Sequence, residues 1–241
     1  QEGRTVAGKG AADIVFVVDC SLSMAPCIEG VKDNISSFVD VFRNDANATW
    51  DLRVDFVAHG IRPGFWARSV YEESPEALVT ELYGKGQGRF FASDIAVFQS
   101  ALSELGPSGD EASFVALDCA LDLPWRSQSG CHRVVVLLTD EPMETGTYLT
   151  RSLALSDSLI EKIHALKVML FMVTPDSEGF ELLSAADKSE WEIVASGSGL
   201  VDVDFQNLLA GIATSISKSQ SPLGTSASIV PRALFNQDCW H

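Results

Sequence analysis

The sequence predicts an α/β fold, in which a central and mostly parallel β-sheet of about six strands lies between helices on both faces. Three segments carry the prediction because they are continuous apolar runs rich in valine: residues 14–19, 133–140 and 167–173. Such runs are typical of central parallel strands, which are buried on both faces. Segments with helical periodicity lie between them, and strands that alternate with helices are joined by right-handed crossovers. The expected architecture is therefore a three-layer, Rossmann-like fold.

In the first half of the chain, each further element follows from apolar spacing or from turn residues. Apolar residues recur every three or four positions in residues 23–43, which predicts an amphipathic helix. Residues 52–60 alternate between apolar and polar, as a half-buried strand does. The aromatic residues in 63–73 indicate an edge strand. Pro75 is suited to the first turn of a helix, which we expect over residues 75–83.

The second half continues the alternation of helices and strands. A glycine-bearing loop at residues 84–88 precedes a helix that ends at Gly106 and Pro107. Periodic apolar residues predict the later helices, and a short run that begins at Trp191 predicts one more strand. The expected helices are residues 95–105, 114–123, 153–166, 180–188 and 205–218, and the expected strand is residues 191–195.

The length of the chain, 241 residues, suits one domain with a substantial core. We expect a flexible lead-in over residues 1–11, the domain over residues 12–219 and a tail over residues 220–241. The tail contains Leu234, Phe235 and Trp240. Because large apolar residues are rarely left in water together, we expect the tail to pack on the domain or on a neighbour.

Composition excludes several classes of function. The hydrophobic fraction is 46%, which is too high for a disordered chain. Lys and Arg total 17 against 33 Asp and Glu, so the net charge is -16. Nucleic acids and anionic lipids are bound by clustered positive charge, so neither is an expected partner. No apolar run approaches the ~20 residues that span a bilayer.

The cysteines and the amino terminus predict a cytoplasmic protein. The five cysteines are scattered, their number is odd, and no two form a CxxC pair, which indicates reduced thiols and neither a disulfide framework nor a zinc site. The first residues contain no apolar signal-peptide core and no initiator Met, so we expect a trimmed chain or a fragment. A signal peptide lost by trimming is the alternative.

Oxygen-bearing side chains follow two of the three apolar strands. Asp19, Ser21 and Ser23 follow the first strand, and Thr139 and Asp140 follow the strand that begins near Arg133. In open α/β sheets, ligands bind at the carboxyl ends of the strands. An acidic loop, residues 109–113, precedes a helix at the same expected edge. Carboxylates and hydroxyls are hard ligands, which suit Mg²⁺ or Mn²⁺ better than zinc.

The pattern Asp-x-Ser-x-Ser after the first strand, with Thr-Asp after a later one, resembles the von Willebrand factor A domain over residues 12–219. The resemblance implies a metal-ion-dependent adhesion site, abbreviated MIDAS. Ser21 and Ser23 would bind the metal directly, and Asp19 and Asp140 would bind it directly or through water. A vacant octahedral position would accept a carboxylate from a partner protein.

The third loop departs from the family pattern, which usually has a threonine ligand there. Asp110, Glu111 and Ser113 are the candidates in this chain. We favour Asp110, because it follows Gly109 where the loop should turn toward the metal. A carboxylate at this position would raise metal affinity and weaken the attraction for an incoming anion.

The resulting hypothesis is a metal-dependent protein-interaction module that is not an enzyme. The resemblance to intracellular bacterial A-domain proteins places it in a stress-response or regulatory assembly. Helix capping by Asp19 and Ser21, or a turn at Asp140, would explain those residues without a metal. A metal-dependent phosphatase-like hydrolase and a secreted adhesin are the alternative functions, although Ser21 stands where the phosphatase pattern has a second aspartate.

A partner would contact the surface around the metal. We expect that surface to be shallow and to include five residues, Leu22, Met24, Asp110, Glu141 and Met143. The alternative is that these residues face the core, and for Met24 the two interpretations are equally supported. Apolar side chains around a hard cation suit a contact surface with one charged anchor at its centre.

Overall fold

The computed structural model describes residues 8–44, 48–60, 67–71, 90–106, 112–127, 130–143 and 149–218. In these residues the chain forms a six-stranded sheet with the order β3-β2-β1-β4-β5-β6. All neighbouring strands are parallel except β2 and β3, which are antiparallel. The strands are β1 Gly8–Asp19, β2 Ala48–His59, β3 Ala67–Arg68, β4 Cys131–Leu138, β5 Val168–Pro175 and β6 Ser189–Val194.

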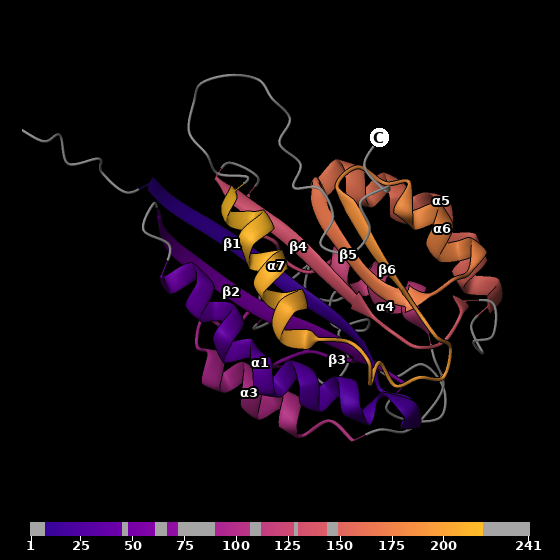
Figure 1. Cartoon of the computed structure of the whole chain (residues 1–241). Helices are drawn as coiled ribbons and strands as arrows, with labels where there is room; N and C mark the ends of the chain where they lie inside the picture. The colour runs from indigo at the N-terminus through magenta and orange to yellow at the C-terminus, as the bar shows by residue number, and fades with distance from the viewer. Residues whose placement is uncertain are drawn as a thin grey trace, which may run out of the picture.

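Helices cover both faces of the sheet, as expected (Figure 1). One face packs against α1, α3 and α7, and the other packs against α4, α5 and α6. The helices are α1 Ala25–Arg43, α3 Ile95–Ser103, α4 Ser113–Leu121, α5 Leu149–Leu166, α6 Glu178–Ser184 and α7 Phe205–Lys218. A short 3-10 helix, η1 Leu22–Met24, connects β1 to α1. The predicted α/β architecture is therefore confirmed. Within the described residues, no helix is both long enough and apolar enough to cross a bilayer.

The main differences from the predicted elements lie at their ends. Strand β1 begins at Gly8, several residues before the apolar run, and pairs there with the start of β2. The sequence pattern missed this extension because its residues are small and polar. Gly10 has a packing reason to lack a side chain, since a Cβ would lie 2.8 Å from the ring of Trp50. Both the expected helix at residues 75–83 and the tail at residues 220–241 lie outside the described residues.

Aromatic rings dominate the core beneath α1, α3 and α7. The ring of Phe16, on β1, lies 6.2 Å from Phe38 of α1 and 5.8 Å from Phe98 of α3. The residues on either side, Val15 and Val17, point to the opposite face and pack beneath α4 and α5. This alternation shows why β1 is apolar throughout: each of its faces is covered by a helical layer.

A buried ion-pair network around Asp13, in the middle of β1, connects β1 to β2 and to the segment before β4. Arg53 donates two hydrogen bonds to the carboxylate of Asp13, at 2.8 and 2.6 Å. Arg126 donates two more, from its side chain at 2.7 Å and from its backbone at 2.8 Å. Burial alone would raise the pKa of Asp13, but the two guanidinium groups lower it. This carboxylate is therefore buried as a fully paired anion.

A second buried carboxylate, Asp55 of β2, organises the chain around β3. Its oxygens accept hydrogen bonds from the backbone N–H groups of Phe56, Val70 and Phe91, at 2.8, 2.9 and 2.8 Å. Burial raises the pKa of Asp55 to about 6, although these three donors favour the charged form. Because the donors come from separate segments, Asp55 joins β2 to the residues after β3 and before α3.

We expect Asp55→Ala to lower the free energy of unfolding by about 2–4 kcal/mol, because two long-range buried N–H groups would lose their acceptor. Urea denaturation would measure the change. Asp40→Ala is a suitable control, since Asp40 is exposed and forms only an i,i+3 ion pair with Arg43. Equal stability losses in the two variants would contradict this role for Asp55.

Candidate metal centre

The candidate site lies where the direction of sheet building reverses. From β1 the chain continues through α1 to β2 on one side, whereas β4 pairs on the other side of β1. The carboxyl ends of β1 and β4 therefore meet at one edge of the sheet, and crevices at such points are the usual ligand sites of open α/β folds (Figure 1). Asp19 is the last residue of β1, and Thr139 and Asp140 directly follow β4.

Three oxygen atoms form a connected row at this edge. The hydroxyl oxygens of Ser21 and Ser23 are 3.1 Å apart. The Ser23 hydroxyl donates to Oδ1 of Asp140 over 2.9 Å. The structure thus brings together residues 117 positions apart that the sequence had placed in one site.

Asp19 fixes the loop after β1 and connects it to β4. Its Oδ1 accepts a hydrogen bond from the backbone N–H of Ser21 at 2.7 Å. Its Oδ2 accepts one from the hydroxyl of Thr139 at 2.8 Å. Asp19 is thus the fourth predicted residue found at this edge. Its position behind the serines, where it orients their backbone, is typical of a residue that supports metal ligands.

Helix capping does not account for these side chains. Ser21 occupies the N-cap position of η1, but its hydroxyl makes no capping hydrogen bond. Met24 precedes α1 and offers no side-chain cap either. The hydroxyls of Ser21 and Ser23 are instead directed to each other and to Asp140.

The loop between β6 and α7 holds Asp140, and the sequence analysis had not placed this loop in the site. The backbone N–H of Gly199 donates to Oδ2 of Asp140 at 2.6 Å, and that of Gly197 donates to its carbonyl at 2.8 Å. Both glycines have positive φ, and a Cβ on Gly199 would lie 2.2 Å from the carbonyl oxygen of Ser23. The alternating glycines of this loop were the only signal in the sequence.

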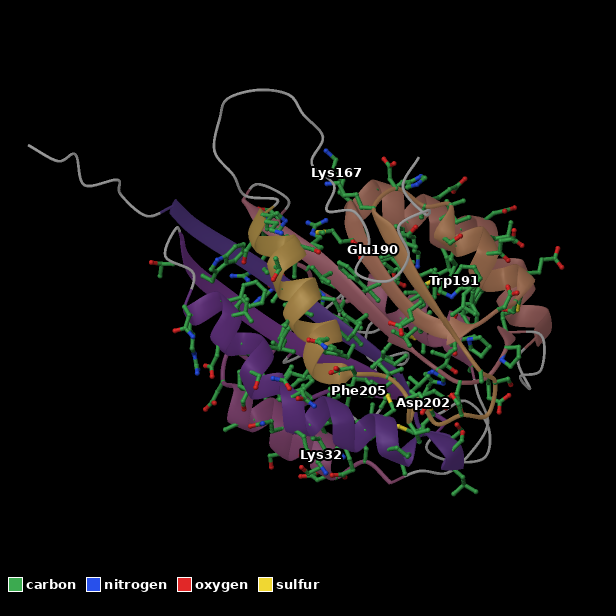
Figure 2. All side chains as sticks on the ribbon, viewed as in Figure 1. Lys32, Lys167, Glu190, Trp191, Asp202 and Phe205 are labelled. Carbon is green, nitrogen blue, oxygen red and sulfur yellow. The ribbon has the colours of Figure 1, made fainter. Side chains whose placement is uncertain are left out.

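The same loop leads into α7, which packs against α1. Figure 2 labels Asp202 and Phe205 at the start of α7, above α1. A Cβ on Gly30 of α1 would lie 2.4 Å from the ring of Phe205, so the two helices approach closely there. The loop between β6 and α7 is therefore held in two places, by the hydrogen bonds to Asp140 and by the packing of α7 on α1.

The electrostatics of the site favour a cation. The side chains of Asp19 and Asp140 are completely buried, and no Lys, Arg or His side chain in the described residues pairs with either. Burial and, to a smaller extent, the charge of Asp140 raise the pKa of Asp19 to about 6, against the hydrogen bonds from Ser21 and Thr139. Two buried carboxylates without a positive partner are unfavourable, and a bound cation would offset that cost.

The oxygen row also fits a small divalent cation geometrically. Adjacent oxygens of an octahedron around Mg²⁺ lie about 2.9 Å apart, given metal–oxygen distances of about 2.0–2.1 Å. The two distances in the row, 3.1 and 2.9 Å, are close to this spacing. Among the described residues, no group of three or more His, Cys, Asp or Glu side chains forms a metal cluster. The candidate centre combines two serine hydroxyls with one carboxylate oxygen, and all three are hard oxygen donors.

The third loop is described only in part. Asp110, the favoured third ligand, and Glu111 lie outside the described residues. Ser113 is the first residue of α4 and is buried, with 7% of its surface exposed. The preceding residue, Ala112, donates its backbone N–H to Nδ1 of His59 at 3.2 Å. His59, which ends β2, is a second residue that sequence reasoning did not assign to this edge.

The prediction of which residues lie on the contact surface is partly wrong. Leu22 is 78% exposed, as predicted, but Met24 and Met143 are buried in the core. Met24 packs beneath α1, and Met143 fills the space left by the absent side chain of Gly179. Val201, in the same β6–α7 loop as Gly199, is a further exposed apolar residue, with 61% of its surface exposed.

The cysteines near the site are free and inert. Cys20 and Cys27 are buried, and burial raises the pKa of Cys20 to about 12 and that of Cys27 well above its usual value. Neutral thiols are poor ligands and poor nucleophiles. None of the four described cysteines takes part in a disulfide.

Comparison with known proteins supports the fold. No family model and no curated protein matches the sequence. The structure is similar to proximal thread matrix protein 1 from the mussel byssus, with a TM-score of 0.53 and 13% identity over 88% of this chain and 49% of that one. Another structure of that protein has zinc in its MIDAS motif, with a TM-score of 0.52 and 17% identity over 85% and 46% of the two chains.

Bacterial pilus proteins are similar as well. The pilus adhesin SpaC of Lactobacillus rhamnosus GG has a TM-score of 0.53 and 15% identity over 90% of this chain and 31% of that one. A variant of the PilB minor pilin of Streptococcus sanguinis has a TM-score of 0.55 and 11% identity over 92% and 65%. The chain thus spans about half of the mussel protein's structure and a third of SpaC. At these identities the similarity shows a shared fold.

The Gly199 contact gives a prediction about stability. Alanine at a positive φ costs about 1 kcal/mol, so Gly197→Ala should lower the free energy of unfolding by about that amount, because a Cβ there meets nothing within 4 Å. Gly199→Ala should cost at least about 2 kcal/mol, because its Cβ must also displace Ser23. Urea denaturation of both variants makes the comparison, and equal losses would show that Ser23 and the loop are not in close contact.

Proposed function

We propose that this chain is a metal-dependent protein-interaction module that binds Mg²⁺ or Mn²⁺ at Ser21, Ser23, Asp140 and Asp19. The observation that carries the proposal is the row of oxygens from Ser21 through Ser23 to Asp140, together with the burial of Asp19 and Asp140, neither of which pairs with a cationic side chain of the described residues. The MIDAS motif of the similarly folded mussel protein is in keeping with it.

The four residues would have different roles in binding the cation. Ser21 and Ser23 would supply neutral hydroxyl ligands, whereas Asp140 and Asp19 would supply negative charge directly or through water. When bound, the cation would supply a Lewis-acidic position for an anionic oxygen of a partner. Because two ligands are neutral, the charge of the cation would be only partly balanced, and an acidic side chain would be attracted strongly. Asp110 remains our proposed third-loop ligand.

We propose a binding role and not catalysis. The hydroxyls of Ser21 and Ser23 are hydrogen-bonded to each other and to Asp140, and no histidine or lysine among the described residues is bonded to either. A serine nucleophile needs a base within hydrogen-bonding distance. The site therefore has the groups to hold a cation, and in the described part of the chain it forms no Ser–His or Ser–Lys pair.

The proposed ligand is an acidic side chain flanked by apolar residues on a partner protein. Leu22 and Val201 are exposed apolar residues. Leu22 lies in the loop after β1, and Val201 lies in the β6–α7 loop, whose Gly199 donates to Asp140. Exposed apolar side chains around a charged centre are typical of the core of a protein interface. We propose a cytoplasmic partner within a stress-response or regulatory assembly, in keeping with the reduced thiols.

Metal binding is tested by Asp19→Asn. Asparagine keeps the shape of the side chain and can still accept the N–H of Ser21, but it removes the negative charge. We expect the affinity for Mg²⁺, measured by titration calorimetry, to fall by about 10- to 100-fold while the fold is retained. The control is Asp94→Asn, which makes the same charge change at the N-cap of α3, where asparagine caps equally well. Unchanged affinity in Asp19→Asn would refute the site.

Partner recognition is tested with immobilised peptides that carry one Glu between apolar residues, and with matched Gln peptides. We expect only the Glu peptides to bind, in Mn²⁺ and not in EDTA. Leu22→Ser should weaken peptide binding without changing metal affinity, whereas Leu182→Ser, at an exposed leucine on α6, should leave both unchanged. Peptide binding that survives EDTA, or that survives Ser21→Ala combined with Ser23→Ala, would contradict the proposal.

A further inference from the structure

His59 connects two loops of the proposed site. Its carbonyl oxygen accepts a hydrogen bond from the backbone N–H of Cys20 at 2.8 Å, and its Nδ1 accepts one from the backbone N–H of Ala112 at 3.2 Å. The parallel register of β1 and β2 places His59 directly beside Asp19. A single residue therefore ties the loop after β1 and the start of α4 to the end of β2.

The protonation of this histidine follows from its contacts. Because Nδ1 accepts the amide hydrogen of Ala112, the ring carries its one proton on Nε2. The side chain is completely buried, and burial lowers the pKa of His59 to about 3, so the ring is neutral at physiological pH. The Nδ1 acceptor is thus present at every pH at which the site would hold a metal.

Packing alone does not account for a histidine here. Nε2 is buried and has no hydrogen-bond partner in the described part of the chain. A buried donor without a partner is unfavourable, and an apolar side chain of similar size would avoid that cost. The feature that an apolar residue would lack is the acceptor for Ala112.

We propose, on the basis of the proposed metal site, that His59 is a positioning residue for that site. By accepting the N–H of Ala112 it sets where α4 begins, and therefore where Ser113, the first residue of α4, stands relative to the loop after β1. His59 does not bind the metal itself, because its Nδ1 is already engaged. It acts on the site through Ala112 and Cys20, in the way that outer residues orient metal ligands.

Three variants test the inference by Mg²⁺ calorimetry near pH 7. His59→Leu removes the acceptor and should lower the affinity at least tenfold. His59→Asn offers a carboxamide oxygen close to the position of Nδ1 and should restore most of the affinity. His164→Leu is the matched control, because Nε2 of His164 also accepts a backbone N–H, from Asp187, but lies on α5. Its affinity should equal that of the unchanged chain.

A measurement without metal complements the titrations. In the ¹⁵N-labelled, metal-free chain, nuclear magnetic resonance should show His59 protonated on Nε2 only, and the amide of Ala112 should exchange slowly. That amide should exchange faster in His59→Leu than in His59→Asn. If His59→Leu does not fold, the tautomer in the unchanged chain and the affinity of His59→Asn decide the matter.

The outcomes separate this inference from the proposed function. If the unchanged chain does not bind Mg²⁺ or Mn²⁺, the proposed function fails, and the inference falls with it. If the unchanged chain binds and His59→Leu binds equally well, the positioning role is wrong and the metal site stands. The role is also wrong if His59→Asn is as weak as His59→Leu, or if Nδ1 carries the proton.

Discussion

Two carboxylates, Asp19 and Asp140, are completely buried at the ends of neighbouring parallel strands, and the structure of this edge depends on how their charge is accommodated. Backbone N–H groups and hydroxyls surround them, from Ser21, Ser23, Thr139 and Gly199. These donors come from three separate loops, so satisfying the two carboxylates is what brings the loops together. Hydrogen bonds from N–H groups and hydroxyls stabilise this negative charge without neutralising it, and a bound cation, as proposed above, would neutralise it.

Strand β1 carries two buried aspartates, Asp13 in its middle and Asp19 at its carboxyl end. Asp13 is neutralised by the guanidinium groups of Arg53 and Arg126. Asp19 has no such partner among the described residues, and its pKa is raised where that of Asp13 is lowered. The same residue type in the same strand thus has a structural role at one position and a candidate functional role at the other. The difference is set by the charge supplied nearby and not by burial, which the two share.

Most of the fold and the main part of the site could be predicted from local patterns. Apolar runs mark strands with two covered faces, and carboxyl ends of adjacent parallel strands must meet, which is why Asp19 and Asp140 could be joined in advance. The contacts of Gly199 with Asp140 and of His59 with Ala112 could not be predicted, because they depend on the tertiary packing of loops that are distant in the sequence. The sequence left open whether Met24 and Met143 face solvent or the core, and the choice depends on local packing: Met24 lies in the short helix η1, and Met143 lies against Gly179, which has no side chain.

Cys20 stands between two residues of the candidate site, with its thiol buried and its pKa raised to about 12. Such a thiol reacts with alkylating reagents only when the surrounding chain opens, so its modification rate measures the frequency of that opening. Cys27 lies in the first turn of α1 and is equally buried, so we expect it to react only when the start of that helix opens as well. Comparing the alkylation rates of Cys20 and Cys27 would therefore distinguish opening of the loop after β1 from opening that also includes the start of α1. No cysteine would have to be introduced for this measurement.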